Sequence, residues 1–202
     1  YGFGSAYWFA ASCRHNSLRP HVIVVRREEK LAGILPLVMT EGSKEATFVN
    51  YLTDYNDVIT AAKDSETAAA LLQFACSHPN GYTSINLKHL RPDSNCLRAM
   101  SLLNQESDLK HSFRETLICY YLRLPANHDT FLRSKDSRFR KRLKRLQALA
   151  GKAGLTAVEI EPGSFQPSQL PDLFLSLHLR RRKVKSCFEL SPAQNFVIEM
   201  AP

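Results

Sequence analysis

The sequence HVIVVRREEKLAGILPLVM occupies residues 21–39 and carries the strongest strand signal of the chain. Its two halves, 21–27 and 30–39, are rich in β-branched and other apolar residues, which favour strands. The polar pair Glu28-Glu29 separates them, so an antiparallel hairpin is predicted. Pro36 cannot donate a ladder hydrogen bond, and we therefore expect it at a bulge or at a sheet edge.

The segments around the hairpin predict an α+β fold with a mixed, mostly antiparallel sheet flanked by helices. Residues 5–13 (SAYWFAASC) are apolar almost all round, which predicts a buried first helix. Apolar residues recur at helical spacing from Ala68 to Cys76, which predicts a helix over 64–77. The other expected elements are strands at 46–50, 57–61 and 82–88, a helix at 94–104 and a strand pair within 113–124.

The most basic stretch, RSKDSRFRKRLKRLQALAGKAG, runs from Arg133 to Gly154, and eight of the residues from 133 to 145 are Lys or Arg. Phe139, Leu143, Leu146 and Ala150 recur at helical spacing, while most of the cations lie off this stripe. An amphipathic helix anchored along one side is therefore predicted. Gly151 and Gly154 are expected to end it, because glycine tolerates the left-handed conformation at helix ends.

The pattern after this helix predicts the start of a second α/β unit. Residues 155–161 alternate as a strand, 170–183 carry apolar residues on one side, and Ser191-Pro192-Ala193-Gln194 is a capping box that begins a last helix. A helix, a strand and two more helices do not make a domain, and the chain starts without Met. We therefore expect a chain trimmed from a longer protein and cut off inside its second half.

The net charge of the chain is +8, and much of the positive charge is concentrated in two short runs. Residues 133–145 and 180–185 (RRRKVK) hold thirteen of the 27 basic residues, and the remainder carries 14 basic residues against 18 acidic ones. Because the body is mildly acidic, the two basic runs indicate an anionic partner at one place. Salt bridges to the acidic body, a nucleic acid and a simply solvated face remain alternatives for the basic helix.

Composition limits the class of protein further. No run approaches the roughly 20 apolar residues that span a bilayer, so no membrane helix is predicted. The five cysteines are scattered and include no CxxC pair, so neither a metal site nor a disulfide is indicated. A reducing cytoplasm is therefore the expected location.

Several stretches together resemble one family. They are an aromatic first helix with Trp8, the hairpin VIVVRREEKLAGILPL, the segment LTDYNDVIT, the run SKDSRFRKRLKRLQALAGKAG and the segment LFLSLHLRRRK. The chain resembles the GNAT-like acyltransferases of the cellulose-biosynthesis CelD type, also called BioF2-like, which are distantly similar to the Fem peptidyltransferases. In that family two GNAT-like halves join near a basic helix with a pattern like SK-x-x-R-x-x-x-R, whose places Ser134, Lys135, Arg138 and Arg142 occupy here.

The resemblance implies a domain order and an activity. It implies a first GNAT-like domain at 1–125, a basic connector region at 126–154 and an incomplete second GNAT-like domain at 155–202. The implied activity is acyl transfer from acetyl-CoA or another acyl-CoA to an amine or hydroxyl of a cell-envelope or polysaccharide precursor. Most of the acyl-CoA-binding half would lie beyond residue 202, so we expect this chain alone to be inactive.

The pyrophosphate-binding pattern of GNAT enzymes, R/Q-x-x-G-x-G/A, is not found. The stretch from Gln147 to Gly154 has the wrong spacing, and its glycines close a helix instead of opening one. The terminal Gly2-Phe3-Gly4 is equally unconvincing. No cofactor-binding residue and no catalytic residue is therefore assigned.

Seven residues are candidates for binding the substrate. Asp54, Tyr55 and Asp57 lie in a bend that is expected either to satisfy its own backbone or to form a cleft wall, where a carboxylate could act as general base. The density of like charge in the basic run suggests an anionic ligand there. The resemblance adds the cleft-facing LH-x-x-R pattern. The candidates are Asp54, Tyr55, Asp57, Lys135, Arg138, Arg142 and His178.

The expected partner is an anionic small molecule or glycan acceptor. Two alternatives to acyl transfer stay open: a non-catalytic domain that binds an anionic glycan or nucleotide-sugar, and a nucleic-acid-binding module. Nucleic acid is the less favoured partner, because the basic run contains only Phe139 as an aromatic residue, and this residue faces the apolar stripe.

Overall fold

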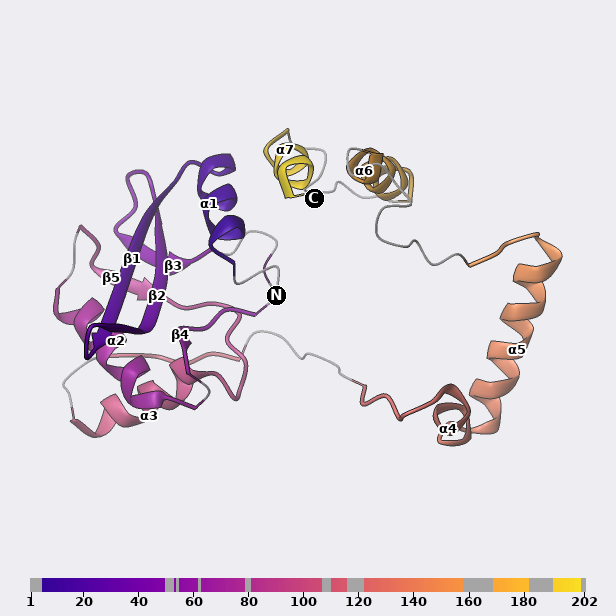
Figure 1. Cartoon of the computed structure of the whole chain (residues 1–202), viewed down its shortest axis with the longest axis horizontal. Coiled ribbons are helices and arrows are strands. Elements are labelled where there is room, and N and C mark those ends of the chain that lie inside the picture. Colours follow the sequence, from indigo (N-terminus) through magenta and orange to yellow (C-terminus); the bar gives the residue numbers. More distant parts are fainter. Residues whose placement is uncertain are drawn as a thin grey trace. The chain divides into compact units, whose positions relative to one another are not determined.

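The computed structural model in Figure 1 describes residues 5–49, 53, 55–61, 63–78, 81–106, 110–115, 122–157, 169–181 and 191–200. Their contacts form two compact units. The first comprises Tyr1–His111 with Gln166–Pro202, and the second comprises Ser112–Phe165. The predicted division at residues 125 and 154 stays a prediction.

The first unit is built on a mixed sheet, as predicted. Its strands are β1 (Leu18–Arg27), β2 (Lys30–Thr40), β3 (Glu45–Phe48), β4 (Ile59–Thr60) and β5 (Ser84–Asn86). The order is β1-β2-β3-β5, and β4 also pairs with β2. Every pair is antiparallel except β3 with β5, which is parallel. The fold is therefore α+β with a mostly antiparallel sheet.

The predicted hairpin is confirmed, with Leu18 opposite Thr40 and Arg27 opposite Lys30. Glu28 and Glu29 form its link with φ angles of 48° and 62°. Positive φ at both residues is the geometry of a type I′ hairpin turn, although this turn usually selects Asn or Gly. The polar link therefore turns the chain at some local strain.

Pro36 does not lie where it was expected. It pairs with Val22 inside the long β2 strand, whereas the register shift of the hairpin falls between Val25 and Arg26. On its other side β2 pairs with β4 at Gly33 and Ile34 and with β3 from Leu37 onward. Pro36 falls between these two stretches, and a residue without an N–H group is tolerated at such a position.

Helices α1 (Ala6–His15), α2 (Ser65–Ser77) and α3 (Asn95–Glu106) confirm the three helices predicted in this unit. Residues of β2, α2 and α3 share one apolar core. Its buried members are Ile23, Leu35, Leu37, Met39, Ala46, Phe48, Val58, Ala68, Leu71, Leu72, Ala75, Tyr82, Cys96, Ala99 and Leu103. Helix α1 differs from the prediction, because only Ala11 and Ser12 in it are buried and the ring of Tyr7 is 54% exposed.

Gly33 lets α2 approach β2 closely. A Cβ atom at this position would lie 2.7 Å from Cγ2 of Thr67 and 3.0 Å from Cδ1 of Leu71. Glycine in a strand often marks such a close approach.

Two helices near the end of the chain belong to the first unit, α6 (Gln169–Arg181) and α7 (Ser191–Met200). The last one begins at the predicted capping box. It packs against α1, and the rings of Trp8 and Phe196 meet edge to face with centroids 4.6 Å apart. Phe196 is 1% exposed. The first and last described helices of the chain are thus in direct contact.

The second unit contains α4 (His128–Arg133) and α5 (Ser137–Lys152), which are labelled in Figure 1. Helix α5 confirms the helix predicted in the basic stretch. At its end Leu155 N donates to Ala150 O and Gly154 N to Gly151 O, while Gly154 adopts a φ of 67°. These are the two bonds of a Schellman motif, so Gly154 ends the helix and Gly151 lies inside it.

Several predicted strands are shorter or are not observed. Residues 113–115, 122–124 and 155–157 are irregular, and the rest of the strands predicted at 113–124 and 155–161 lies outside the described residues. Within the described ranges, no helix is both long enough and apolar enough to cross a membrane.

Candidate functional site

A shallow hollow lies where the bend before β4 meets the loop between β5 and α3. Its volume is about 220 Å³, and its lining residues are Tyr55, Asn56, Asp57, Arg91, Asp93 and Ser94. Two of the predicted substrate-binding residues, Tyr55 and Asp57, therefore line the same hollow. Asp54 lies outside the described residues.

Backbone and side-chain hydrogen bonds hold the bend against the loop. Asn56 N donates to His89 O at 3.1 Å, and the Asn56 side-chain amide donates to Lys88 O at 3.3 Å. Nδ1 of His89 lies 2.8 Å from Thr53 O, and His89 itself has a φ of 61°. These contacts bring together residues that are more than thirty positions apart in the sequence. No local sequence pattern predicts such contacts.

Asp57 caps helix α3 from a distance in sequence. Its carboxylate accepts hydrogen bonds from Asn95 N at 2.7 Å and from Cys96 N at 2.9 Å. It also accepts one from Val58 N at 2.9 Å. Because N–H groups at a helix start lack partners inside the helix, a carboxylate there is stabilising. Asp57 thus has a structural role, and its predicted role in substrate binding stays a prediction.

The environment of Cys96 follows from this cap. Burial raises the pKa of the Cys96 thiol, and the neighbouring Asp57 carboxylate raises it further. A thiol held protonated in this way is a poor nucleophile. Cys96 therefore acts as a core residue.

Arg91 and Asp93 form the polar rim of the hollow. Nε of Arg91 lies 2.9 Å from Oδ1 of Asp93, and Nη2 lies 3.0 Å from Oδ2, so the pair is bidentate. Both side chains are about 60% exposed, which leaves the pair accessible to a ligand. The guanidinium carbon also lies 5.9 Å from the centre of the Tyr55 ring. An exposed aromatic face, a cation and a carboxylate thus share one small surface.

Arg91, Asp93, Ser94 and Asn56 were not identified from the sequence. The only local signal was the polar segment RPDSN before α3, which was interpreted as the start of a helix. Sequence spacing does not show that this segment faces Tyr55.

Side-chain oxygens fill the starts of three helices in the described part of the chain, α2, α3 and α5. Asp64 accepts from Thr67 N at 3.0 Å and from the Thr67 hydroxyl at 2.7 Å, which lowers the pKa of Asp64. Asp57 fills α3, and Asp136 accepts from Phe139 N at the start of α5. A pyrophosphate binds such N–H groups when they are free. The described residues at these three starts therefore do not fit an acyl-CoA pyrophosphate.

The predicted basic residues lie in the second unit. Lys135 places its ammonium 4.8 Å from the centre of the Phe131 ring. Arg138 and Arg142 are exposed on α5, four positions apart, so they are neighbours on one side of that helix. They do not belong to the unit that contains the hollow, and their binding role stays a prediction.

His178 lies in α6 of the first unit and is partly buried. Its ring lies 5.5 Å from the ring of Phe174, one turn earlier on the same helix. This contact is that of a packed histidine, and the predicted substrate contact of His178 stays a prediction.

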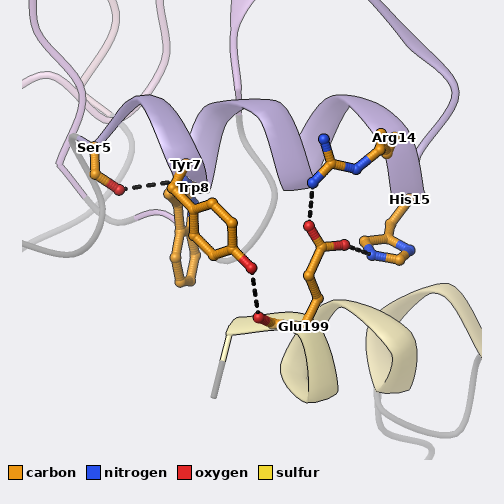
Figure 2. Close-up of polar contacts among 6 residues, drawn as sticks. All are labelled: Ser5, Tyr7, Trp8, Arg14, His15 and Glu199. Carbon is orange, nitrogen blue, oxygen red and sulfur yellow. Dashed lines mark hydrogen bonds and ion pairs between the residues drawn. The ribbon is translucent and has the colours of Figure 1, made fainter. Parts of the chain in front are cut away.

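A polar cluster between α1 and α7 was also missed from the sequence (Figure 2). The Glu199 carboxylate forms an ion pair with Arg14, and Nε2 of His15 lies 2.5 Å from its other oxygen. The hydroxyl of Tyr7 donates to the Glu199 carbonyl at 2.9 Å. Hydrogen bonds from Arg14 and His15 lower the pKa of the Glu199 carboxyl. The cluster holds α7 onto α1.

Comparison with known proteins adds no family. Known protein-family models, curated proteins and solved structures each yield no match to this chain. Among the described residues, no group of three or more His, Cys, Asp or Glu side chains could hold a metal ion. We therefore take the hollow between the bend at 55–57 and the loop at 91–94 as the candidate site.

Proposed function

We propose that this chain provides the acceptor-binding part of an acyl-CoA-dependent acyltransferase, and that the hollow at Tyr55, Arg91 and Asp93 binds a carbohydrate-like acceptor. The observation that carries this proposal is the bidentate Arg91–Asp93 pair beside the exposed ring of Tyr55. Acyl transfer is proposed because of the family resemblance, and the class of acceptor is proposed because of the residues that line the hollow.

The chemistry of the hollow suits a sugar with an anionic group. Tyr55 is 59% exposed and has Arg91 over one face of its ring, so the exposed part of the ring can stack on the apolar side of a sugar ring. Nε and Nη2 of Arg91 donate to Asp93, so Arg91 can donate to a phosphate or carboxylate through Nη1, and the oxygens of Asp93 can accept further hydrogen bonds from hydroxyl groups. The carboxylate of Asp57 already accepts hydrogen bonds from three backbone N–H groups, so no contact with the acceptor is assigned to it.

A second candidate is a binding domain for an anionic glycan or nucleotide-sugar without any transfer. The filled starts of α2, α3 and α5 favour this candidate, because they leave no free helix start in these elements for the pyrophosphate of a cofactor. Both candidates predict the same ligand class for the hollow. They differ only in whether an acyl group is transferred.

Titration calorimetry with UDP-glucose as a nucleotide-sugar probe tests the site. We expect Arg91→Ala to weaken binding roughly 10- to 150-fold, the equivalent of about 1.5–3 kcal/mol for a hydrogen bond to a charged group. Tyr55→Ala should weaken it as well. Arg26→Ala, which removes an exposed arginine from the hairpin, is the matched control and should bind like the unmodified chain.

Two outcomes would change the proposal. If UDP-glucose does not bind, or binds equally to Arg91→Ala, the hollow is not the acceptor site. If UDP-glucose binds, a transfer assay with radiolabelled acetyl-CoA tests the transferase. Labelled sugar supports the transferase, whereas binding without labelling agrees with both candidates, because the resemblance implies that this chain alone is inactive.

A further inference from the structure

Helix α5 carries an unusual combination of charge and exposed apolar surface. Its 16 residues include seven Lys or Arg side chains and no acidic one. The acid just before it, Asp136, is engaged as its N-cap. The ion pairs found among the described residues lie on other elements. The positive charge of α5 is thus not neutralised by a carboxylate of the described residues.

Most large apolar side chains of α5 lie on a narrow arc. At about 100° per residue, Phe139, Leu143, Leu146 and Ala150 fall within about 60° of the helix circumference, and Leu149 lies about 60° beyond Leu146, on the far side of Arg142. Arg140 and Arg142 border this arc on its two sides, and the other cations occupy the rest of the circumference. Phe139 is 40% exposed and Leu146 is 52% exposed, and no residue of α5 is buried.

Helix α4 extends the same arc. The rings of Phe131 and Phe139 meet edge to face with centroids 6.2 Å apart. The ammonium of Lys135 lies over the Phe131 ring, at the border between apolar and charged surface. We call the surface formed by Phe131, Phe139, Leu143 and Leu146 with its flanking cations the basic amphipathic face.

The pattern discriminates between partners. A helix that packs on a protein core normally shows a continuous apolar stripe at least about 100° wide, whereas the continuous stripe of α5 is narrower, because Arg142 separates Leu149 from it. A nucleic acid would engage the cations and leave the apolar arc exposed. The headgroup region of a bilayer engages both, because apolar side chains enter the boundary of the acyl chains while long basic side chains reach the headgroups.

We propose that the basic amphipathic face of α4 and α5 binds the surface of a bilayer that contains anionic phospholipids. The helix would lie in the plane of the interface, since its length of about 24 Å is too short and its charge too high for a span. The proposal is independent of the acceptor site, because it rests on α4 and α5 alone.

Cosedimentation of the full chain with vesicles tests this surface. Vesicles of phosphatidylcholine are compared with vesicles containing one quarter phosphatidylglycerol. We expect binding to the anionic vesicles only, and the double variant Arg140→Gln/Arg142→Gln should bind about 30-fold more weakly, from about fivefold per cation. Leu146→Ser should weaken binding roughly tenfold, because it removes apolar area from the interface.

Matched controls separate the surface from general charge. Lys30→Gln/Lys44→Gln removes two exposed cations from the first unit, and Leu31→Ser removes an exposed leucine from the hairpin. Both should bind vesicles like the unmodified chain.

Three results would overturn the proposal. The first is no binding to anionic vesicles at 50 mM NaCl. The second is unaltered binding by Leu146→Ser together with competition by duplex RNA, which would assign the cations to a nucleic acid. The third is a lowered thermal midpoint in Leu146→Ser without vesicle binding, which would mean that another part of the protein covers the arc.

Discussion

Two inner leucines of β2 and two leucines of α5 show how differently one residue type is used in this chain. Leu35 and Leu37 in β2 are 0% exposed and share a core with α2 and α3. Leu146 and Leu149 in α5 are about half exposed, and neither α4 nor α5 contains a buried residue. Periodic spacing predicts both kinds of element, but only burial shows which of them contributes a hydrophobic core.

The difference has a physical cause. Helix α2 has small and apolar side chains that fit over Gly33 of β2, so burying its stripe excludes water from a large area. Helix α5 has cations at many of its exposed positions, and like charges three or four positions apart weaken a helix. Substitutions in the two units should therefore have very different effects on the free energy of unfolding.

The largest effect is expected for Leu35→Ala. Truncating a fully buried leucine leaves a cavity and should lower the free energy of unfolding by about 2–5 kcal/mol. Leu146→Ala removes the same atoms from α5 and should change it by less than about 0.5 kcal/mol, as is usual for surface substitutions. Urea denaturation followed by circular dichroism measures both. Equal losses would erase the contrast between the two units.

The next effect is expected for Asp57→Ala. This change leaves two N–H groups of α3 without their carboxylate partner, and it should cost about 2–3 kcal/mol by the usual strength of hydrogen bonds to charged groups. Asp93→Ala, an exposed acid of the same hollow, should cost less than about 1 kcal/mol, the usual value of a surface ion pair. The same urea titration compares them. A stable Asp57→Ala protein would argue against the structural role of this cap.

Gly33→Ala should have a smaller effect on the same core. The added Cβ would approach Cγ2 of Thr67 at 2.7 Å, so α2 must shift or the Thr67 side chain must turn. We expect a loss of about 1–2 kcal/mol, at the lower end for overpacked cores. Gly151→Ala is the control, since a Cβ there meets no atom within 4 Å and alanine favours helix. A neutral Gly33→Ala would show that α2 is not held tightly against β2.

These contrasts also explain what could be predicted from the sequence. The hairpin, α2, α3 and α5 were predicted correctly because their periodicity and turn residues are local signals. The short pairing of β3 with β5 and the meeting of Tyr55 with Arg91 depend on contacts between distant segments, which one sequence does not encode in any local pattern. Tyr55 and Asp57 were placed in the correct bend, but the carboxylate of Asp57 could not be assigned to the start of α3.

The contact of α7 with α1 should depend on pH. The pKa of Glu199 is lowered in the folded chain from a usual value of 4.5, so its stabilising contribution is present above that value and is lost as the pH falls through the folded pKa. Hydrogen exchange of the α7 amides, corrected for intrinsic rates, should therefore accelerate in acid. Glu199→Gln should abolish this dependence, whereas Glu66→Gln on α2 should not. An unchanged profile in Glu199→Gln would exclude the cluster as its origin.

The smallest effect is expected in α5 itself, and it has the opposite sign. Arg142→Gln removes the charge between Arg138 and Arg145, which lie four positions before it and three after it. Two repulsive neighbour pairs are removed, so α5 should gain about 0.4–1 kcal/mol of local stability. Hydrogen exchange of residues 137–152 measures this gain, while urea denaturation of the sheet unit should not change. Because exposed charges are screened, the gain should shrink at high salt. A loss of protection instead would mean that Arg142 already has an anionic partner, and α5 would then resemble the packed helices of the first unit.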